Sequence, residues 1–136
     1  MFIENVSKGD LIIGSHVQTT EMDFLIQIHE PEAEFCQPKA KFGSICRLRF
    51  MDTDDRMKLP GEVKISAEQA DEILDFLNAA KQRCANVIVQ CPTGIHRSGA
   101  VVELGIALGF KTVPGRFRNP NPSVRRVLML ALERNK

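Results

Sequence analysis

A cysteine and an arginine stand six positions apart in the last third of the chain, as Cys91 and Arg97, with Gly94 between them. A thiolate is a strong nucleophile, and a planar guanidinium pairs with two phosphate oxygens at once. The glycine lets the backbone turn sharply and approach a bound anion closely. These residue types predict a loop that holds a phosphoryl group against a nucleophilic sulfur. The other cysteines lack an arginine at this spacing, and they are Cys36, Cys46 and Cys84.

The segments on either side of this loop predict how it is positioned. Residues 86–89 form a short β-branched run typical of a buried strand, and residues 100–108 form an apolar stretch typical of a helix. A loop that enters a helix directs several N–H groups and the positive end of the helix dipole at an anion. We therefore expect phosphate contacts from Pro92, Thr93, Gly94, Ile95, His96 and Arg97. The alternative is a buried, inert thiol beside a helix start.

Phosphate ester hydrolysis also needs a proton donor for the leaving oxygen. Residues 45–50 alternate apolar and basic side chains, as a half-exposed strand does, and an acidic segment follows with Asp52, Asp54 and Asp55. A helix over 66–83 comes next, with a capping box that starts at Ser66 and an apolar face. We expect Asp52 to be the acid, with Asp54 and then Asp55 as alternatives. A solvated acidic turn is the competing interpretation.

The segment Cys91-Pro92-Thr93-Gly94-Ile95-His96-Arg97-Ser98-Gly99 resembles the signature loop of the protein tyrosine phosphatase superfamily, cysteine–x5–arginine–serine. With its short length, the chain is similar to compact dual-specificity or bacterial and phage tyrosine-phosphatase-like proteins, over residues 45 to 132. The resemblance implies a cysteinyl-phosphate intermediate, with Cys91 as nucleophile and the Ser98 hydroxyl assisting its departure. It also implies an acid at the first position after the strand, which is Asp52. The family usually has histidine where this chain has Gln90, and Pro92 removes one backbone donor.

The chain of 136 residues is expected to form one α/β domain over residues 1–136, with a central, largely parallel sheet flanked by helices. Residues 10–15 and 24–29 are predicted as strands, and residues 30–43 as a loop. A final helix is predicted from Asn121-Pro122, with Arg125 and Arg126 in water. Its inward residues are expected to be Val124, Val127, Leu128 and Ala131.

Charge and composition limit the partners. The net charge of +1 argues against broad nucleic-acid binding, and no apolar stretch is long enough to span a membrane. The last 26 residues carry seven basic side chains against one acidic, so their charge of +6 could attract an acidic or phosphorylated substrate. His16 and His29 are interpreted as ordinary strand-end histidines, so neither a metal nor another cofactor is expected. We expect a cytoplasmic monomer, since irregularly spaced cysteines and a catalytic thiol suit a reducing compartment.

These observations predict a metal-independent phosphomonoester hydrolase of the tyrosine or dual-specificity type, acting on phosphorylated proteins or small phosphomonoesters. One alternative is a pseudo-phosphatase that binds phosphorylated partners without turnover. Another is a phosphatase for RNA 5′-phosphates or phosphoinositides, which the near absence of cations in the loop disfavours. Sulfur transfer of the rhodanese type is more distant, because Ser98 and the acidic segment argue against it.

Overall fold

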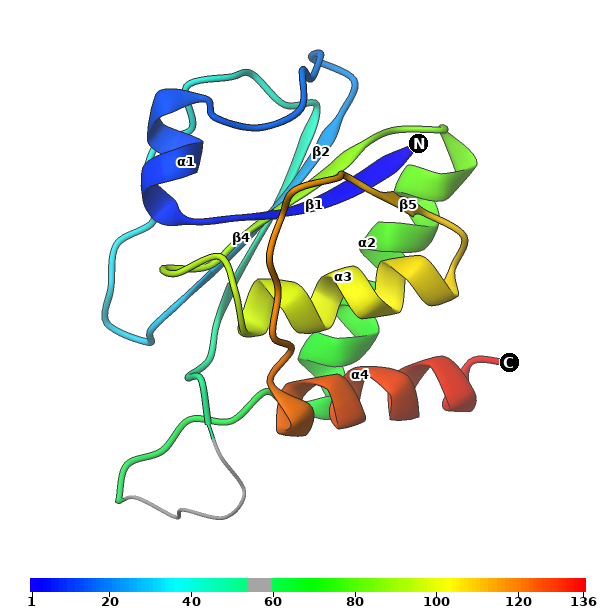
Figure 1. The fold of residues 1–136 in the computed structure, drawn as a ribbon. Helices are drawn as coiled ribbons and strands as arrows, with labels where there is room; N and C mark the ends of the chain where they lie inside the picture. The colour runs from blue at the N-terminus through cyan, green and yellow to red at the C-terminus, as the bar shows by residue number, and fades with distance from the viewer. Residues whose placement is uncertain (54–59) are drawn as a thin grey trace.

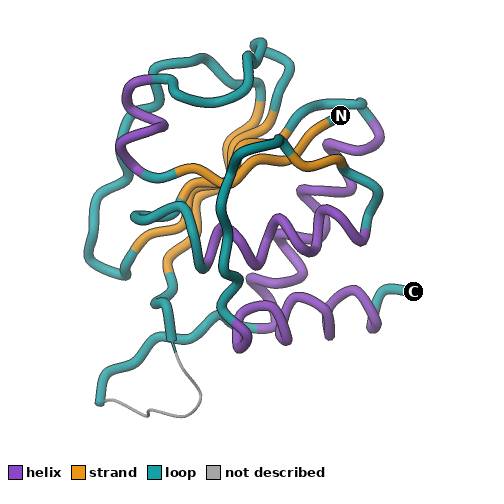
Figure 2. The backbone as a smooth tube through the Cα atoms, in the orientation of Figure 1, coloured by secondary structure: helices purple, strands orange, loops and turns teal. Residues whose placement is uncertain are grey.

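The computed structural model describes residues 1–53 and 60–136, which form a parallel sheet between layers of helix and loop (Figures 1 and 2). The sheet has the strand order β3-β2-β4-β1-β5, and each neighbouring pair is parallel. The strands are β1 (Phe2–Val6), β2 (Phe24–His29), β3 (Ser44–Arg49), β4 (Val87–Gln90) and β5 (Lys111–Thr112). The helices are α1 (Lys8–Ile13), α2 (Ala67–Gln82), α3 (Arg97–Ala107) and α4 (Pro122–Arg134). The predicted α/β class with a parallel sheet is confirmed.

The two faces of the sheet are covered unequally. The main core lies between the sheet and helices α2, α3 and α4, and includes Val87, Val89, Leu77, Val101 and Leu128. A smaller core of Val6, Leu11, Leu25 and Ile88 lies under α1 and the loop that follows β2. Consecutive residues of β4 therefore point into different cores, as alternation along a strand requires.

Strand β4 lies in the middle of the sheet, and its neighbour β1 leads into α1 on one face while β4 leads into α3 on the other. Neighbouring strands whose connections leave in opposite directions open a crevice at their carboxyl ends, where ligands bind in sheets of this kind. Figure 1 shows the loop from β4 to α3 at this edge. The topology therefore places residues 91–96 at the favoured position for a site.

Helices α2 and α4 follow their predictions. Ser66 caps α2 and forms a capping box with Gln69, and the predicted apolar face is buried through Ala70, Ile73, Leu74, Leu77 and Ala80. Asn121 caps α4, Pro122 is its first residue, and Arg125 and Arg126 are exposed. Val124, Leu128 and Ala131 are buried, and Val127 packs against them. Propensity and capping determined these two helices locally.

The strand predicted over residues 10–15 is wrong, because this segment lies in and after helix α1. Ser7 and Asp10 form a reciprocal capping box, and Gly14 ends the helix in the left-handed region at φ 77°. The apolar run misled the prediction, since Leu11 is buried but Ile12 and Ile13 are 46% and 64% exposed. Capping chemistry therefore outweighed the apolar run.

Only one of the two predicted strand-end histidines ends a strand. His29 ends β2, as predicted, whereas His16 lies in the loop after α1, with its ring 6.2 Å from that of Phe42. Strands β1 and β5 were not predicted. Within the described residues, no helix has both the length and the apolar character to cross a membrane.

Candidate active site

The loop between β4 and α3 has its two chemically important residues at its ends. Cys91 directly follows β4, and Arg97 is the first residue of α3. The N-cap residue His96 makes no side-chain cap hydrogen bond, and the first turn has no acidic residue. The first amides of a helix without a cap are donors that an anion can satisfy. The positive end of α3 therefore remains available to a ligand in the loop.

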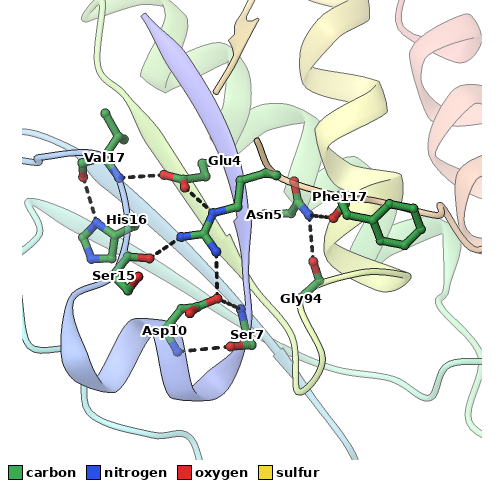
Figure 3. A network of polar contacts seen from close by, with 10 residues as sticks. Glu4, Asn5, Ser7, Asp10, Ser15, His16, Val17, Gly94 and Phe117 are labelled. Atoms are coloured by element: carbon green, nitrogen blue, oxygen red, sulfur yellow. Dashed lines mark hydrogen bonds and ion pairs between the residues drawn. The ribbon is translucent and has the colours of Figure 1, made fainter. Parts of the chain in front are cut away.

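The back of the loop is fixed against the end of β1. Gly94 has φ 71°, and a Cβ there would lie 2.3 Å from the Ser7 nitrogen. Asn5 Nδ2 donates to the Gly94 carbonyl at 2.7 Å and to the Phe117 carbonyl at 2.8 Å (Figure 3). The Lys8 amide also donates to the Pro92 carbonyl at 3.3 Å. Glycine is required here because backbone meets backbone, a reason the sequence did not supply.

Arg116 holds the segment that carries Phe117 through three acceptors, two carboxylates and one backbone carbonyl. Arg116 Nε lies 2.5 Å from Glu4 Oε2, Arg116 Nη1 lies 2.9 Å from Asp10 Oδ2, and the remaining Nη2 donates to the Ser15 carbonyl. Figure 3 shows these acceptors converging from β1, α1 and the loop after α1. Burial raises the pKa of Asp10, but hydrogen bonds from Ser7 and Arg116 together with the Arg116 charge outweigh it and hold that pKa below its ordinary value. This cluster fixes the support of the loop.

Cys91 is 1% exposed, and its Sγ lies 3.1 Å from Ser98 Oγ. If the sulfur is a thiolate, the serine hydroxyl is the donor in this contact. Two other cysteines are poorer nucleophiles because burial raises the pKa of each thiol: burial and the neighbouring Glu72 carboxylate raise the pKa of Cys46 to about 12, and burial raises that of Cys36. Where Cys91 has the Ser98 hydroxyl, Cys36 Sγ lies 3.7 Å from Gln90 Oε1 and Cys46 Sγ lies 3.8 Å from Glu72 Oε1.

The Arg97 guanidinium is held on one side and unsatisfied on the other. Its Nη1 donates to the Phe50 carbonyl at 2.8 Å, and its Nη2 lies 2.8 Å from Glu30 Oε1. Its Nε is buried and has no hydrogen-bond partner among the described residues. A buried guanidinium N–H without an acceptor is costly, and a phosphoryl oxygen would satisfy it. This unsatisfied donor is the feature of the loop that most directly suggests an anion.

Asn121 joins the acidic segment to the loop between β4 and α3. Its Nδ2 donates to Asp52 Oδ1 at 2.6 Å and to the Thr53 carbonyl at 2.7 Å. Its backbone N–H donates to the His96 carbonyl at 3.1 Å, while Asn121 Oδ1 caps α4. The sequence indicated Asn121 only as a helix start. A side-chain amide at an N-cap uses its oxygen for the cap, so its two spare N–H donors were a signal that could have been followed.

The remaining predicted residues differ in their exposure. Asp52 is exposed beside the buried Thr53, while Asp54 and Asp55 lie outside the described residues. Within the loop, Thr93 is exposed and Ile95 and His96 are half-buried. His96 Nδ1 lies 2.9 Å from the Asn119 carbonyl, and the Asn119 amide donates to Ile95. The structure thus places the Cys91 sulfur against the Ser98 hydroxyl, puts Arg97 at the end of the same loop, and links Asp52 to that loop through Asn121.

Gln90, the residue before the candidate nucleophile, is fully buried in a polar cluster on the α1 face. Its side-chain amide lies 2.9 Å from His29 Nε2 and accepts from Gln27 Nε2 at 3.2 Å. Arg47 Nε extends this hydrogen-bond network by donating to Gln27 Oε1 at 2.9 Å. Burial lowers the pKa of His29, with Lys8 and Arg97 adding to the effect against the Gln90 hydrogen bond. An imidazole therefore lies beside the loop, supplied by β2.

Among residues 1–53 and 60–136, no cluster of histidine, cysteine and carboxylate side chains could hold a metal ion. The chain matches no protein-family model, and it matches no curated protein. Among solved structures, it is similar to the human tyrosine phosphatase-like serine/threonine/tyrosine-interacting protein, with a TM-score of 0.64 and 20% identity. The similarity covers 98% of this chain and 92% of that chain. The chain therefore has a phosphatase-like fold.

Proposed function

We propose that the protein hydrolyses phosphomonoesters through a cysteinyl-phosphate intermediate. The observation that carries this proposal is the arrangement of one loop and the helix start that follows it. The Cys91 sulfur lies 3.1 Å from the Ser98 hydroxyl, and the buried Arg97 Nε has no acceptor among the described residues. The phosphatase-like fold supports it. An inert buried thiol would need neither an uncapped helix start nor a half-satisfied guanidinium beside it.

In the first step, Arg97 Nε and the loop amides bind the phosphoryl oxygens, and the Cys91 thiolate attacks phosphorus. The S–P bond forms as the bond from phosphorus to the ester oxygen breaks. The leaving oxygen takes a proton from the Asp52 carboxyl group, which Asn121 holds beside the loop. Positioned proton donors of this kind contribute about 10²–10⁴-fold to a rate.

In the second step, water attacks the cysteinyl phosphate and gives a proton to the Asp52 carboxylate. The S–P bond breaks, phosphate leaves, and the thiolate is restored. The Ser98 hydroxyl, 3.1 Å from the sulfur, donates to the charge that returns to it. Proton and electron pairs balance over the two steps, and each group ends as it began.

A pseudo-phosphatase is the second candidate, because Glu30 occupies one edge of the Arg97 guanidinium. A carboxylate that stayed there would withhold that edge of the guanidinium from the phosphoryl oxygens and so slow turnover. The structural neighbour is itself described as phosphatase-like and interacting. The two candidates differ in turnover and not in phosphate binding.

The test measures hydrolysis of a generic aryl phosphate and binding of vanadate by the wild type and three variants. We expect Cys91→Ser to abolish hydrolysis and Asp52→Asn to lower kcat by about 10²–10⁴-fold with vanadate binding retained. Activity that survives in Cys91→Ser contradicts the mechanism. A wild type that binds vanadate but does not hydrolyse the ester favours the pseudo-phosphatase.

Asn121→Ser separates positioning from folding. Serine also caps helices well, so α4 should keep its stability, but its side chain is too short to hold the Asp52 carboxylate. We expect kcat to fall about tenfold while KM, vanadate affinity and the melting temperature stay near wild type. If KM and the melting temperature change instead, Asn121 has a structural role only.

A further inference from the structure

The outward face of α4 carries a groove that the proposed chemistry does not use. Its volume is about 430 Å³, within the range of peptide-sized and ligand-sized clefts. Two helical rows border it, residues 122, 126 and 130 and residues 125, 129 and 133, each spaced by four. Pro120 completes the lining. Apolar side chains therefore alternate with charged ones along a surface turned away from the core.

The apolar part of this groove is exposed. Leu130 is 52% exposed, although Val124, Leu128 and Ala131 of the same helix are buried in the core. Met129 lies partly buried between the two faces. Exposed apolar side chains that line a hollow, unlike scattered ones, indicate a binding surface.

Charge within the groove is asymmetric. Arg125 lies near the start of α4, where the helix dipole is positive and the first turn has no acidic residue. The lining carboxylate is Glu133 at the far end, and its Oε1 lies 3.0 Å from Lys136 Nζ. A basic side chain at the positive end of a helix does not serve helix stability, so an acidic ligand explains Arg125 better. The end of the groove nearest the loop is positive.

That positive end adjoins the candidate active site. Pro120 and Pro122 of the groove flank Asn121, which donates to Asp52 Oδ1 at 2.6 Å and to the His96 carbonyl of the loop. Figure 1 shows α4 starting near the N-terminal end of α3 and running away from it. A chain with its phosphorylated residue in the loop would meet the groove at Pro120 and follow α4 outward.

We propose that this groove binds the segment flanking the phosphorylated residue of a protein substrate, through one acidic and one apolar side chain. This inference rests on the proposed function and names its substrate class. The five positions from Arg125 to Leu130 span about 8 Å of helix, which an extended peptide covers in about two residues. The preferred flank therefore has a carboxylate near the phosphorylated residue and an apolar residue about two positions beyond it.

The test uses phosphotyrosine peptides with glutamate and leucine two positions apart, placed on either side of the phosphotyrosine. Matched peptides have serine in place of both residues or have the two in reversed order. We expect the wild type to prefer the glutamate–leucine peptide on one side by about tenfold in kcat/KM, equal to about 1.4 kcal/mol. The double variant Leu130→Gln/Arg125→Gln should lose this preference. It should keep its wild-type kcat/KM for the aryl phosphate.

Controls carry the same kinds of change elsewhere. Ile13→Gln removes an exposed apolar side chain on the other face of the sheet, and Lys111→Gln removes a charge on β5. Both should keep the peptide preference. The proposal is overturned if the wild type does not distinguish the peptides or if the double variant keeps the preference. It is also overturned if light scattering finds a dimer that the double variant dissolves, since a second copy would then occupy the groove.

A binding assay separates this inference from the proposed function. Fluorescence anisotropy of the labelled peptides reports docking whether or not hydrolysis occurs. A protein that hydrolyses neither substrate but prefers the glutamate–leucine peptide in this assay contradicts the hydrolase and keeps the groove. A protein that hydrolyses the aryl phosphate but binds all peptides equally keeps the proposed hydrolase and contradicts the groove.

Discussion

The close approach of the β4–α3 loop to β1 leads to a quantitative prediction for Gly94→Ala. Two costs add at this position. The residue has φ 71°, and a side chain in the left-handed region costs about 1–2 kcal/mol. The new Cβ would also lie 2.3 Å from the Ser7 nitrogen and 2.4 Å from the Val6 carbonyl carbon, both backbone atoms. Relief of such overpacking costs about 1–3 kcal/mol more.

Gly61 and Gly115 are matched controls for the first cost alone. Their φ values are 75° and 85°, and an added Cβ at either would meet nothing within 4 Å. Gly61→Ala and Gly115→Ala should therefore lose only about 1–2 kcal/mol of unfolding free energy. Gly94→Ala should lose about 2 kcal/mol more than either. For a domain of this size that difference corresponds to about 8 °C in melting temperature.

The assay is urea and thermal unfolding of the three variants, followed by vanadate binding to each folded protein. Gly94→Ala should also bind vanadate more weakly, because the loop can accept a Cβ only by moving away from Ser7. Gly115→Ala should bind it as the wild type does. Equal melting temperatures for Gly94→Ala and the two controls would refute the close approach. Unchanged vanadate affinity in Gly94→Ala would refute the link from this contact to the anion site.

Two other perturbations test the surroundings of the loop. Glu30→Ala should lower kcat/KM for an aryl phosphate about tenfold, because Arg97 loses one of the two groups that orient it. Glu30→Gln keeps an acceptor for the guanidinium, so its kcat/KM should stay within about threefold of the wild type. Tighter vanadate binding by Glu30→Ala would instead show that the carboxylate competes with phosphate. Burial lowers the pKa of His29 below 6.5, so the unfolded chain binds more protons than the folded one, and the unfolding free energy should fall as pH drops below 6.5 towards that lower pKa. The fall is at most about 1.4 kcal/mol per pH unit. In urea titrations from pH 7.5 to 5, His29→Gln should lose this part of the pH dependence, and an unchanged dependence would contradict the assignment to His29.

Local signals determined the elements that carry the site. The β-branched run before Cys91 became β4, and the apolar stretch after Arg97 became α3. Capping boxes and an N-cap before proline determined α2 and α4. These features depend on residues within one or two turns of one another, so a sequence pattern contains them. The assignment of Cys91, Arg97 and Asp52 to chemistry remains a prediction that the kinetic test addresses.

Strand β1 was not predicted because a carboxylate and an amide side chain in its middle are not typical of a buried strand. Glu4 and Asn5 are 2% and 3% exposed. Glu4 is compensated by Arg116, 112 positions along the chain, and Asn5 by the Gly94 and Phe117 carbonyls. Burial of such groups is affordable only when partners are in place, and those partners come from the folded chain. The strand prediction over residues 10–15 failed for the opposite reason, because it gave the apolar run more weight than the capping box of Ser7 and Asp10.

By itself, the sequence determined which residue types stand in the loop and that a strand delivers them to a helix start. Tertiary structure decided what those residues meet. The Arg97 guanidinium contacts Glu30 and the Phe50 carbonyl from two other strand ends, and Asn121 reaches Asp52 across 69 positions. Spacing along a chain fixes geometry only within an element. Contacts between elements depend on strand order and on the faces to which the helices turn, and only packing of the whole core sets these.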